Sequence, residues 1–417
     1  MSRLRTLSLP TLLLLFVGAP VFWAFPEGLP FWRAAGIILG WAGAGLLLFN
    51  LLLMVREVRL ASSLGGLERI TAWHHQTGMT AYLLLLLHPL ALAAAGWAEW
   101  PNLAWQVISP FSENWPVWLG WAGLIFLMLG LATTFMSRLA YSTWRWLHGL
   151  LGLGVLIGFI HVLQLGISAG GLLALAAAVL LLIWRLLRVD LGTAAKPYIV
   201  TSVRSVAQSM VEISLKPLAM PVDAVPGQFV LAAFFRGPNY QGCGEFHPFT
   251  VSGLGLEDEL RIGVKALGDC TRRMQSLEPG VSARVHGPFG EFLKDLPSRP
   301  LLWVAGGIGI TPFIGFLRQQ SVETATTLIY LYRDEQDAAY LDELTTLSAN
   351  SPGLALQAEA TGTGVPNLNR LLPSAEALAN HECYVCGPPR LIDAVSRTLL
   401  ERRVPTERIH FEHFDFR

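Results

Sequence analysis

The sequence predicts a multidomain membrane protein, in which a six-helix transmembrane bundle precedes an antiparallel β-barrel and an α/β doubly wound domain. Three observations support this prediction. Only 14% of the 417 residues are charged and 53% are hydrophobic, whereas about a quarter of the residues in an ordinary soluble protein are charged. The long apolar runs end near residue 190. After them come short apolar strands, and then strands that alternate with helices.

Six segments of the first part are apolar and long enough to cross the hydrocarbon core of a bilayer, which takes about 20 residues. They cover residues 7–25, 34–55, 73–96, 116–136, 146–166 and 170–187. The first segment could instead be a secretory signal, but it lacks a clear small-x-small cleavage site, which favours a retained helix. We therefore expect residues 1–190 to form the transmembrane domain.

Basic residues lie almost entirely on one side of these predicted spans. The side that holds both termini has nine arginines, namely Arg3, Arg5, Arg56, Arg59, Arg69, Arg138, Arg145, Arg185 and Arg188. The short loops of the other side have Arg33. Because loops rich in lysine and arginine stay in the cytoplasm, the sequence predicts a multi-pass protein of the cytoplasmic membrane with both termini inside.

Five of the ten histidines lie within the predicted spans, namely His74, His75, His88, His148 and His161, where an ionisable side chain is costly unless it has a partner. His74 and His88 are 14 residues apart, so on a helix they face nearly the same way, about 21 Å apart along the axis. His148 and His161 are 13 residues apart, which places them about 140° apart on a regular helix. His75 has the same spacing to His88 and remains an alternative to His74.

Both histidine-bearing spans run outward in this orientation, so His74 and His148 share the inner leaflet, and His88 and His161 share the outer leaflet. Two imidazoles from facing helices at one depth are what a six-coordinate haem iron requires. Alternatively, each histidine could bond a carbonyl of a neighbouring helix. Two pairs matched in depth favour iron, so the sequence predicts two stacked haems.

The second part of the chain predicts two soluble domains. Over residues 196–296, the apolar stretches SMVEISLKP, GQFVLAAFF, HPFTVSG, ELRIGVKAL and SARVHGPFG are separated by Gly/Pro turns, which is typical of a small antiparallel barrel. Over residues 297–417, the strands LLWVA, TLIYLYR and ECYVCGPP alternate with helices, which predicts a parallel sheet with its ligand at the carboxyl ends of the strands. The turn GGIGITP could bring a phosphate to the backbone, or it could be a plain tight turn.

The four cysteines, Cys243, Cys270, Cys383 and Cys386, all lie in this second part. Their scatter does not suggest a disulfide framework, which fits a reducing compartment. Cys383 and Cys386 are three positions apart on a predicted strand and should point to opposite faces, so a zinc pair is not expected. The zero net charge and the lack of a dense basic patch argue against nucleic-acid binding.

Five motifs occur in a fixed order: HPFTVSG, VKALGDCT, WVAGGIGITPF, CGPP and an aromatic residue, Phe416, next to the end. In this order they resemble the ferredoxin-reductase-like flavin and nicotinamide module. Together with the paired histidines, nearly the full chain resembles the NADPH oxidase and ferric reductase superfamily, particularly its compact bacterial members. The resemblance implies FAD, two b-type haems and NADPH or NADH as cofactors. We see no calcium-binding or other regulatory extension and expect no regulatory subunit.

The resemblance also implies roles for individual residues. The flavin would be lined by His247, Pro248, Phe249 and Thr250, and its pyrophosphate would be held by Lys265, Gly268, Asp269 and Thr271. The nicotinamide nucleotide would bind at Gly306, Gly307, Gly309, Thr311 and Pro312. The haem irons would be bound by His74, His88, His148 and His161. The family pattern His-x-x-x-Gly matches His74 with Gly78 and favours His74 over His75.

Three further roles follow from the resemblance. Arg333 lies where the family often grips the 2′-phosphate of NADPH, although the neighbouring Asp334 and Glu335 favour NADH. Cys386, followed by Gly387 and Pro388, would lie near the nicotinamide C4. Phe416 would stack on the flavin until the nicotinamide displaces it.

The resemblance implies a transmembrane electron-transfer enzyme. Electrons would pass from cytoplasmic NAD(P)H to FAD, then to the inner and the outer haem, and then to an acceptor outside. Oxygen, giving superoxide, and a ferric complex both fit, and the resemblance to compact bacterial members favours oxygen. Alternatives are a reductase of another membrane acceptor such as a quinone, a haem-binding sensor, and a flavin reductase with a membrane anchor that binds no haem.

Overall fold

The structure is a computed structural model and describes residues 9–18, 25–111, 114–136, 139, 141–364 and 366–412. The chain divides into two compact units, Met1–Leu191 and Gly192–Arg417, and both the barrel and the parallel sheet belong to the second unit. The three domain ranges 1–190, 196–296 and 297–417 stay predictions. Phe416 lies outside the described residues.

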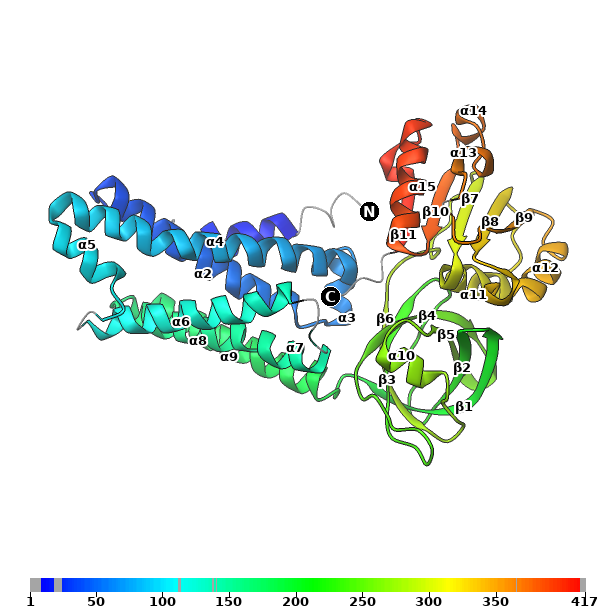
Figure 1. Cartoon of the computed structure of the whole chain (residues 1–417), viewed down its shortest axis with the longest axis horizontal. Helices are drawn as coiled ribbons and strands as arrows, with labels where there is room; N and C mark the ends of the chain where they lie inside the picture. Colours follow the sequence, from blue (N-terminus) through cyan, green and yellow to red (C-terminus); the bar gives the residue numbers. More distant parts are fainter. Residues whose placement is uncertain are drawn as a thin grey trace. The chain divides into compact units, whose positions relative to one another are not determined.

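The first unit is helical (Figure 1). Five of its described helical stretches are long and apolar enough to cross a membrane: Phe31–Leu53, Leu67–Glu99, Trp115–Phe135, Thr143–Gln164 and Gly170–Asp190. The helices that form these stretches are α2 (Phe31–Leu53), α4 (Leu67–Glu99), α6 (Trp115–Ala132), α7 (Tyr141–His148), α8 (Leu150–Gln164) and α9 (Ser168–Arg185). The predicted span 7–25 is described in part, as a helix over Leu9–Gly18, so the sixth crossing stays a prediction.

Two shorter helices lie between the long ones. Helix α3 (Val58–Ser63) precedes α4, and α5 (Pro101–Ile108) follows it in the loop that the orientation places outside. Proline at the start of α5 suits the first turn of a helix, whose amides have no partner within the helix.

Glycines set how closely the long helices approach. A methyl group on Gly36 of α2 would lie 2.6 Å from the Leu92 side chain of α4, and one on Gly43 would lie 2.6 Å from Leu85. Gly123 of α6 and Gly154 of α8 face each other in the same manner, because a Cβ on Gly154 would lie 3.0 Å from the Gly123 carbonyl oxygen. Small residues allow this close packing of membrane helices. The unit is therefore built on two tight pairs, α2 with α4 and α6 with α8.

The predicted span 146–166 is not one regular helix. Helix α7 ends at His148 and α8 begins at Leu150. Between them, the amide of Gly149 is 3.1 Å from the carbonyl oxygens of both Arg145 and Trp146. The separation of about 140° calculated for His148 and His161 assumes a regular helix through Gly149.

A closed antiparallel barrel forms the first part of the second unit, with the strand order β1-β2-β5-β4-β3-β6. The strands are β1 (Lys196–Ala207), β2 (Met210–Pro217), β3 (Phe229–Phe234), β4 (His247–Leu254), β5 (Leu260–Lys265) and β6 (Ser282–Phe289), and the short helix α10 (Asp269–Met274) follows β5. The predicted barrel is confirmed, with one strand more than the sequence indicated. Strand β1 was missed because two register shifts, at Val200/Ser202 and Ser205/Ala207, interrupt its alternation.

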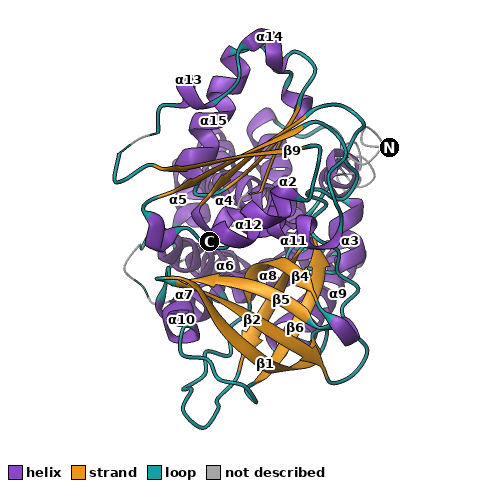
Figure 2. Cartoon of the chain, turned by 90° about the vertical axis from the view of Figure 1, so that its right-hand side faces the viewer, coloured by secondary structure: helices purple, strands orange, loops and turns teal. Residues whose placement is uncertain are grey.

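A five-stranded parallel sheet of order β11-β10-β7-β8-β9 forms the rest of the unit. Its strands are β7 (Leu301–Gly306), β8 (Thr326–Tyr332), β9 (Leu354–Ala360), β10 (Glu382–Cys386) and β11 (Ile409–Glu412). Helices α11 (Thr311–Gln319) and α12 (Leu341–Ala349) cover one face, and α13 (Leu368–Leu371) and α15 (Pro389–Glu401) cover the other (Figure 2). The predicted doubly wound sheet is confirmed, while β9 and β11 were not predicted.

Candidate functional site

The two histidines of the predicted outer pair have the same surroundings. His88 Nδ1 lies 2.7 Å from the Gly36 carbonyl oxygen of α2, and His161 Nδ1 lies 2.7 Å from the Pro116 carbonyl oxygen of α6. A carbonyl oxygen can only accept, so each Nδ1 donates its proton. The neutral ring then has its lone pair on Nε2, the nitrogen that is left to bind a metal ion.

A glycine makes room for each of these two rings. A Cβ on Gly40 would lie 2.7 Å from His88 Nδ1, and a Cβ on Gly120 would lie 3.1 Å from His161 Cε1. Each glycine is four residues after the carbonyl that accepts the proton, Gly36 in α2 and Pro116 in α6. One turn of helix therefore supplies both the acceptor and the space, and the arrangement occurs once in each helix pair.

The two histidines of the predicted inner pair lie close together. The ring centres of His74 and His148 are 6.4 Å apart. Two imidazoles that bind one metal ion from opposite sides have ring centres roughly 6 Å apart, since each metal–nitrogen bond is about 2 Å long. This spacing therefore fits an iron shared by His74 and His148.

Polar and aromatic neighbours hold this inner pair. The carboxamide of buried Asn50 on α2 contacts His74 Nδ1 and lies 2.8 Å from the Thr77 hydroxyl. Thr134 Oγ1 is 3.4 Å from His148 Nδ1, and the Trp144 ring stacks on His148 with centres 4.8 Å apart. Such partners orient a histidine ligand. Asn50 was not predicted, although a lone asparagine among the apolar residues of a membrane span was a usable signal.

The segment His247–Thr250 opens strand β4. Burial lowers the pKa of His247, so its imidazole is neutral near pH 7. Phe249 packs in the barrel interior against Phe234, and Thr250 is buried opposite Phe229 of β3. The predicted contact of these residues and Pro248 with a flavin stays a prediction, in which Phe249 would act mainly by fixing the strand.

The predicted pyrophosphate segment turns from β5 into α10. Thr271 Oγ1 accepts hydrogen bonds from the amides of Leu267 and Gly268, both at 2.9 Å. Asp269 is exposed, and its hydrogen bond with Arg272, at 2.7 Å, lowers the pKa of Asp269. Thr271 thus shapes the turn, and Asp269 stays ionised in neutral solution.

The carboxyl ends of β7 and β10 bring the two predicted nucleotide motifs together. Ala305 of β7 pairs with Cys386 of β10, so the loop with Gly306, Gly307 and Gly309 lies against the CGPP turn with Gly387 and Pro388. A Cβ on Gly309 would overlap the Cys386 carbonyl, and a Cβ on Gly387 would lie 3.2 Å from Gly306. These glycines are therefore required for the backbones to meet.

Helix α11 begins directly after this loop, with Thr311 and Pro312 in its first turn. Thr311 donates from Oγ1 to the Ile308 carbonyl, at 2.8 Å. Lys265 of the barrel lies nearby, because a Cβ on Gly307 would be 3.6 Å from Lys265 Nζ. The ammonium group of the predicted pyrophosphate segment is thus next to the nucleotide loop.

Arg333 lies just after the carboxyl end of β8, two-thirds exposed and 4.0 Å from an oxygen of Asp337. Asp334 instead turns into its own loop, where Oδ1 accepts hydrogen bonds from the amides of Gln336 and Asp337. Asp334, one of the two acids that argued for NADH, is therefore occupied by backbone amides, while the guanidinium is accessible.

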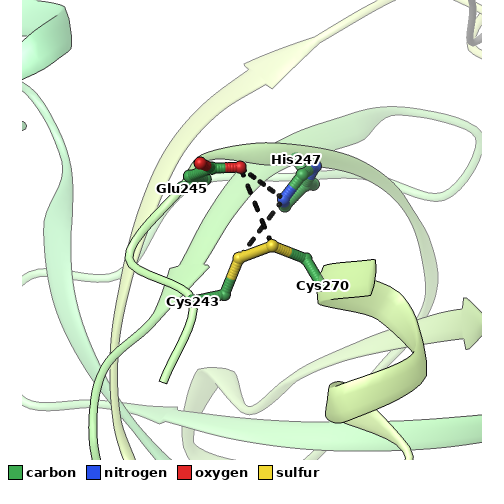
Figure 3. Close-up of side chains that lie close together, drawn as sticks. All are labelled: Cys243, Glu245, His247 and Cys270. Carbon is green, nitrogen blue, oxygen red and sulfur yellow. Dashed lines mark hydrogen bonds and ion pairs between the residues drawn. A yellow bond between two sulfur atoms is a disulfide. The ribbon is translucent and has the colours of Figure 1, made fainter. Parts of the chain in front are cut away.

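The expectation that the cysteines are unpaired was wrong for Cys243 and Cys270. The structure joins them in a disulfide; their Cα atoms are 5.7 Å apart, and the two residues are 27 positions apart in the sequence. Their spacing gave no sign of this, because the approach depends on how the loop before β4 meets α10. Glu245 and His247 lie beside the pair (Figure 3).

Cys383 and Cys386 point to opposite faces of the sheet, as the strand period predicts. Cys383 packs with the α15 side and Cys386 with the α11 side. Burial raises the pKa of Cys383 to about 12, so its thiol stays protonated. The two residues do not form a C-x-x-C metal pair.

An ionic network between barrel and sheet was also missed. Arg318 of α11 donates to Glu212 of β2 at 2.7 Å, to Glu343 of α12 at 2.6 Å and to the Ser252 carbonyl of β4 at 2.8 Å. Burial opposes the charge of Arg318, but the hydrogen bonds from Glu343 and Glu212 outweigh it and raise the pKa of Arg318. The guanidinium lies 5.1 Å from the centre of the Tyr340 ring. The network fixes the barrel against the sheet.

Three family models match successive parts of the chain. The ferric reductase like transmembrane component matches residues 39–159, the FAD-binding domain 196–289 and the oxidoreductase NAD-binding domain 303–397. These three domains, in this order, match the architecture of the ferric reductase and NADPH oxidase-like superfamily. This ferric reductase-like protein is therefore an NAD(P)H-dependent oxidoreductase of a membrane, with FAD- and NAD(P)-binding domains.

Curated relatives share part of this ferric reductase-like chain. The ferredoxin–NAD(P)+ reductase component of the naphthalene 1,2-dioxygenase/salicylate 5-hydroxylase systems of Ralstonia sp is 27% identical over 232 residues, which are 52% of this chain and 67% of the relative. The carnitine monooxygenase reductase subunit of Acinetobacter baumannii is 38% identical over 112 residues, 27% of this chain and 34% of the relative. The FAD/NAD-binding domain of nitric oxide dioxygenase from Vibrio cholerae aligns with a TM-score of 0.46 and 21% identity, covering 52% of this chain and 98% of that one.

Proposed function

We propose that this protein moves electrons from NAD(P)H across the membrane to O2, giving superoxide, and that its four membrane histidines hold two b-type haems. His74 with His148 would bind the inner iron, and His88 with His161 the outer iron. The supporting observation is the Nδ1–H···O=C bond of both outer histidines, at 2.7 Å each. It leaves Nε2 of both rings available to bind a metal ion, and it is compatible with iron because the hydrogen bond and the iron would use different ring nitrogens. In this proposal, each outer histidine therefore both donates to a helix carbonyl and binds iron.

The protein residues supply placement and electrostatics. When bound, FAD accepts hydride from NAD(P)H, and the haems carry single electrons across the hydrocarbon core. Lys265 would neutralise pyrophosphate charge, and Arg333 would bind the 2′-phosphate of NADPH. The carbonyls of Gly36 and Pro116 keep the outer imidazoles in the tautomer that donates Nε2 to a metal. Because Asp334 is occupied by its own loop, we favour NADPH over NADH.

The direction of transfer follows from the arginines. The nine basic residues on one side of the spans support a cytoplasmic location for both termini and for the nucleotide domains. NAD(P)H would then be oxidised inside and the acceptor reduced outside.

Charge on the outer side supports oxygen as acceptor. Residues 97–118 contain no lysine, arginine or histidine, and Arg33 is the basic residue of the outer loops. Ferric chelates such as ferric citrate are anionic and gain from a positive surface, whereas O2 is neutral. A basic patch of that kind is missing from this sequence, which favours the neutral acceptor.

A reduced-minus-oxidised spectrum of the purified full chain tests the proposal. We expect two b-type haems per chain, reducible by NADPH when FAD is present, and His75→Leu should retain both as a matched control. A preparation without haem would contradict the proposal, and haem that NADPH and FAD fail to reduce would indicate a sensor. Superoxide and ferric-chelate turnover measured in one preparation decide the acceptor, since faster ferric turnover would refute oxygen.

A further inference from the structure

Four side chains with metal-binding atoms meet at the start of strand β4. Cys243, Glu245 and His247 come from one short segment and Cys270 from the first turn of α10, and one ligand atom of each lies within 4.8 Å of the others (Figure 3). His247 Nε2 is 3.7 Å from Cys243 Sγ and 3.8 Å from a Glu245 oxygen. Cys270 Sγ lies 3.7 Å from the same carboxylate. The four groups thus point at one small volume.

The kinds of donor select the class of ion. Two thiolates, one imidazole and one carboxylate are ligands that zinc takes in a tetrahedral site, and soft thiolates disfavour magnesium and calcium. Arg273 Nη2 lies 3.6 Å from Cys270 Sγ, where a guanidinium stabilises a thiolate. The second pair, Cys383 and Cys386, does not share this arrangement because its members face opposite sides of the sheet.

The compartment determines whether Cys243 and Cys270 are mainly reduced or joined in a disulfide. Disulfides are rare in the reducing cytosol, where cysteines that converge in a fold are more often metal-binding or catalytic. This step rests on the proposed function, which places the nucleotide-binding unit in the cytoplasm. There the Cys243–Cys270 pair would be reduced for most of its lifetime, and the two thiolates would face a histidine and a glutamate.

We propose that the reduced cluster of Cys243, Glu245, His247 and Cys270 binds one divalent ion of the zinc class. The disulfide is the oxidised, metal-free state of the same site. A peroxide oxidises the reduced site: two thiols and one H2O2 give the disulfide and two water molecules. The ion is released because its two thiolate ligands are lost. Two molecules of a cytosolic thiol reverse the step and become a disulfide themselves.

The position of the cluster gives the ion a structural consequence. His247 begins the segment that is predicted to line the flavin, and Cys270 lies between Asp269 and Thr271 of the predicted pyrophosphate segment. Either a metal ion or the disulfide ties these two segments together, across 27 positions of sequence. The two segments stay tied together in both redox states, but His247 binds the ion only in the reduced state.

Zinc content and the zinc coordination shell of the full-length protein test the proposal. The protein in detergent is reduced with a phosphine without oxygen, its thiols are counted by alkylation, and it is dialysed against Zn²⁺. We expect four thiols and one zinc per chain, with an X-ray absorption shell containing two sulfurs at about 2.3 Å and lighter ligands at about 2.0 Å. Stoichiometric H2O2 should release the ion and leave two thiols.

Variants locate the site. Cys243→Ser and Cys270→Ser should each weaken zinc binding at least tenfold, and Cys383→Ala, which removes a cysteine elsewhere, should leave it unchanged. Zinc that persists in the Cys243→Ser/Cys270→Ser double variant, a shell without sulfur, or a disulfide that resists the phosphine in the folded protein would each overturn the proposal. These readouts do not use electron transfer, so failure of the proposed function shows in the haem spectrum and failure of this inference shows in zinc content.

Discussion

Each outer membrane histidine has two nitrogens, and the fold gives the two nitrogens different partners. Nδ1 of His88 and of His161 donates to a helix carbonyl, which restrains the ring and leaves Nε2 available. A side chain that would be expensive in lipid as an isolated group thus has one hydrogen bond and one open ligand position. This makes the residue identity important, because a leucine supplies neither.

Replacing an outer histidine should therefore remove one haem and leave the flavin part working. For His88→Leu or His161→Leu we expect one haem per chain by a haem assay, where the wild type has two. NADPH-to-soluble-dye reduction should change less than about twofold, because that path does not use the outer iron. His75→Leu is the control and should retain both haems. Loss of dye reduction in the outer variants would contradict the modular route.

Arg333 is the residue on which the choice between NADPH and NADH should depend. A guanidinium–phosphate hydrogen bond contributes about 1.5–3 kcal/mol, so Arg333→Ala should lower kcat/KM for NADPH roughly tenfold to a hundredfold and leave NADH nearly unchanged. Steady-state kinetics with both nucleotides measure this. Arg397→Ala changes an exposed side chain of α15 and should alter kcat/KM for neither nucleotide. Equal losses with the two nucleotides would exclude a 2′-phosphate role.

At this scale the sequence identified candidates better than it identified their partners. The four histidines could be named from depth and spacing, but Asn50 beside His74 and the capping role of Asp334 depend on contacts that the spacing does not show. Asp334 was taken as evidence for NADH because its charge is visible in the sequence, whereas its hydrogen bonds to Gln336 and Asp337 are visible only in the fold.

Among the secondary-structure elements, the glycines of α2 and α6 position the outer histidines. Gly40 and Gly120 leave the space that the rings of His88 and His161 occupy. We expect Gly40→Ala and Gly120→Ala to lower outer-haem content or shift its midpoint potential, measured by spectroscopic redox titration. Gly170→Ala in α9 is the matched control, because a Cβ there meets nothing within 4 Å. Unchanged haem in both test variants would mean that the rings are not held in these grooves.

Irregularities in the elements explain where prediction from the sequence stopped. The break between α7 and α8 at Gly149 was not predicted, because a glycine in an apolar span does not by itself announce a break. The bulges of β1 hide its period, and the short strand β11 has four residues. Long helices and alternating strands were predictable because their period repeats, and single-residue deviations were not.

In the nucleotide-binding unit as a whole, Arg318 stabilises the barrel–sheet contact. Its side chain is 11% exposed and Glu212 is 4% exposed, and the two residues are 106 positions apart in the sequence. No motif or local pattern links them, so this contact could not be predicted from the sequence. Burying such charges is favourable only when each has good partners, and here Glu212 also receives the Ser252 hydroxyl at 2.8 Å and Arg204 at 2.9 Å.

Removing the buried cation should destabilise this unit by an amount that depends on pH. Arg318→Met leaves Glu212 and Glu343 without their main partner, and breaking a buried pair costs about 3–5 kcal/mol. Arg204 would offset part of this, because it keeps its own hydrogen bond to Glu212. Unfolding of the full-length protein in detergent, followed by denaturant titration at pH 7, measures the loss, and Arg397→Met is the exposed control.

The direction of the pH effect follows from Glu212. Burial alone would raise the pKa of Glu212, but its hydrogen bonds and charge interaction with Arg318 outweigh burial and hold the pKa below the usual value. A lowered folded-state pKa stabilises the protein above the unfolded-state pKa of about 4.3, and that stability is lost as the pH falls through the folded-state value. Between about pH 5 and pH 3 the wild type should therefore lose stability, while Arg318→Met, with Glu212 able to accept a proton, should lose less. A constant difference between the two proteins over this range would show that Glu212 does not depend on Arg318 for its charge.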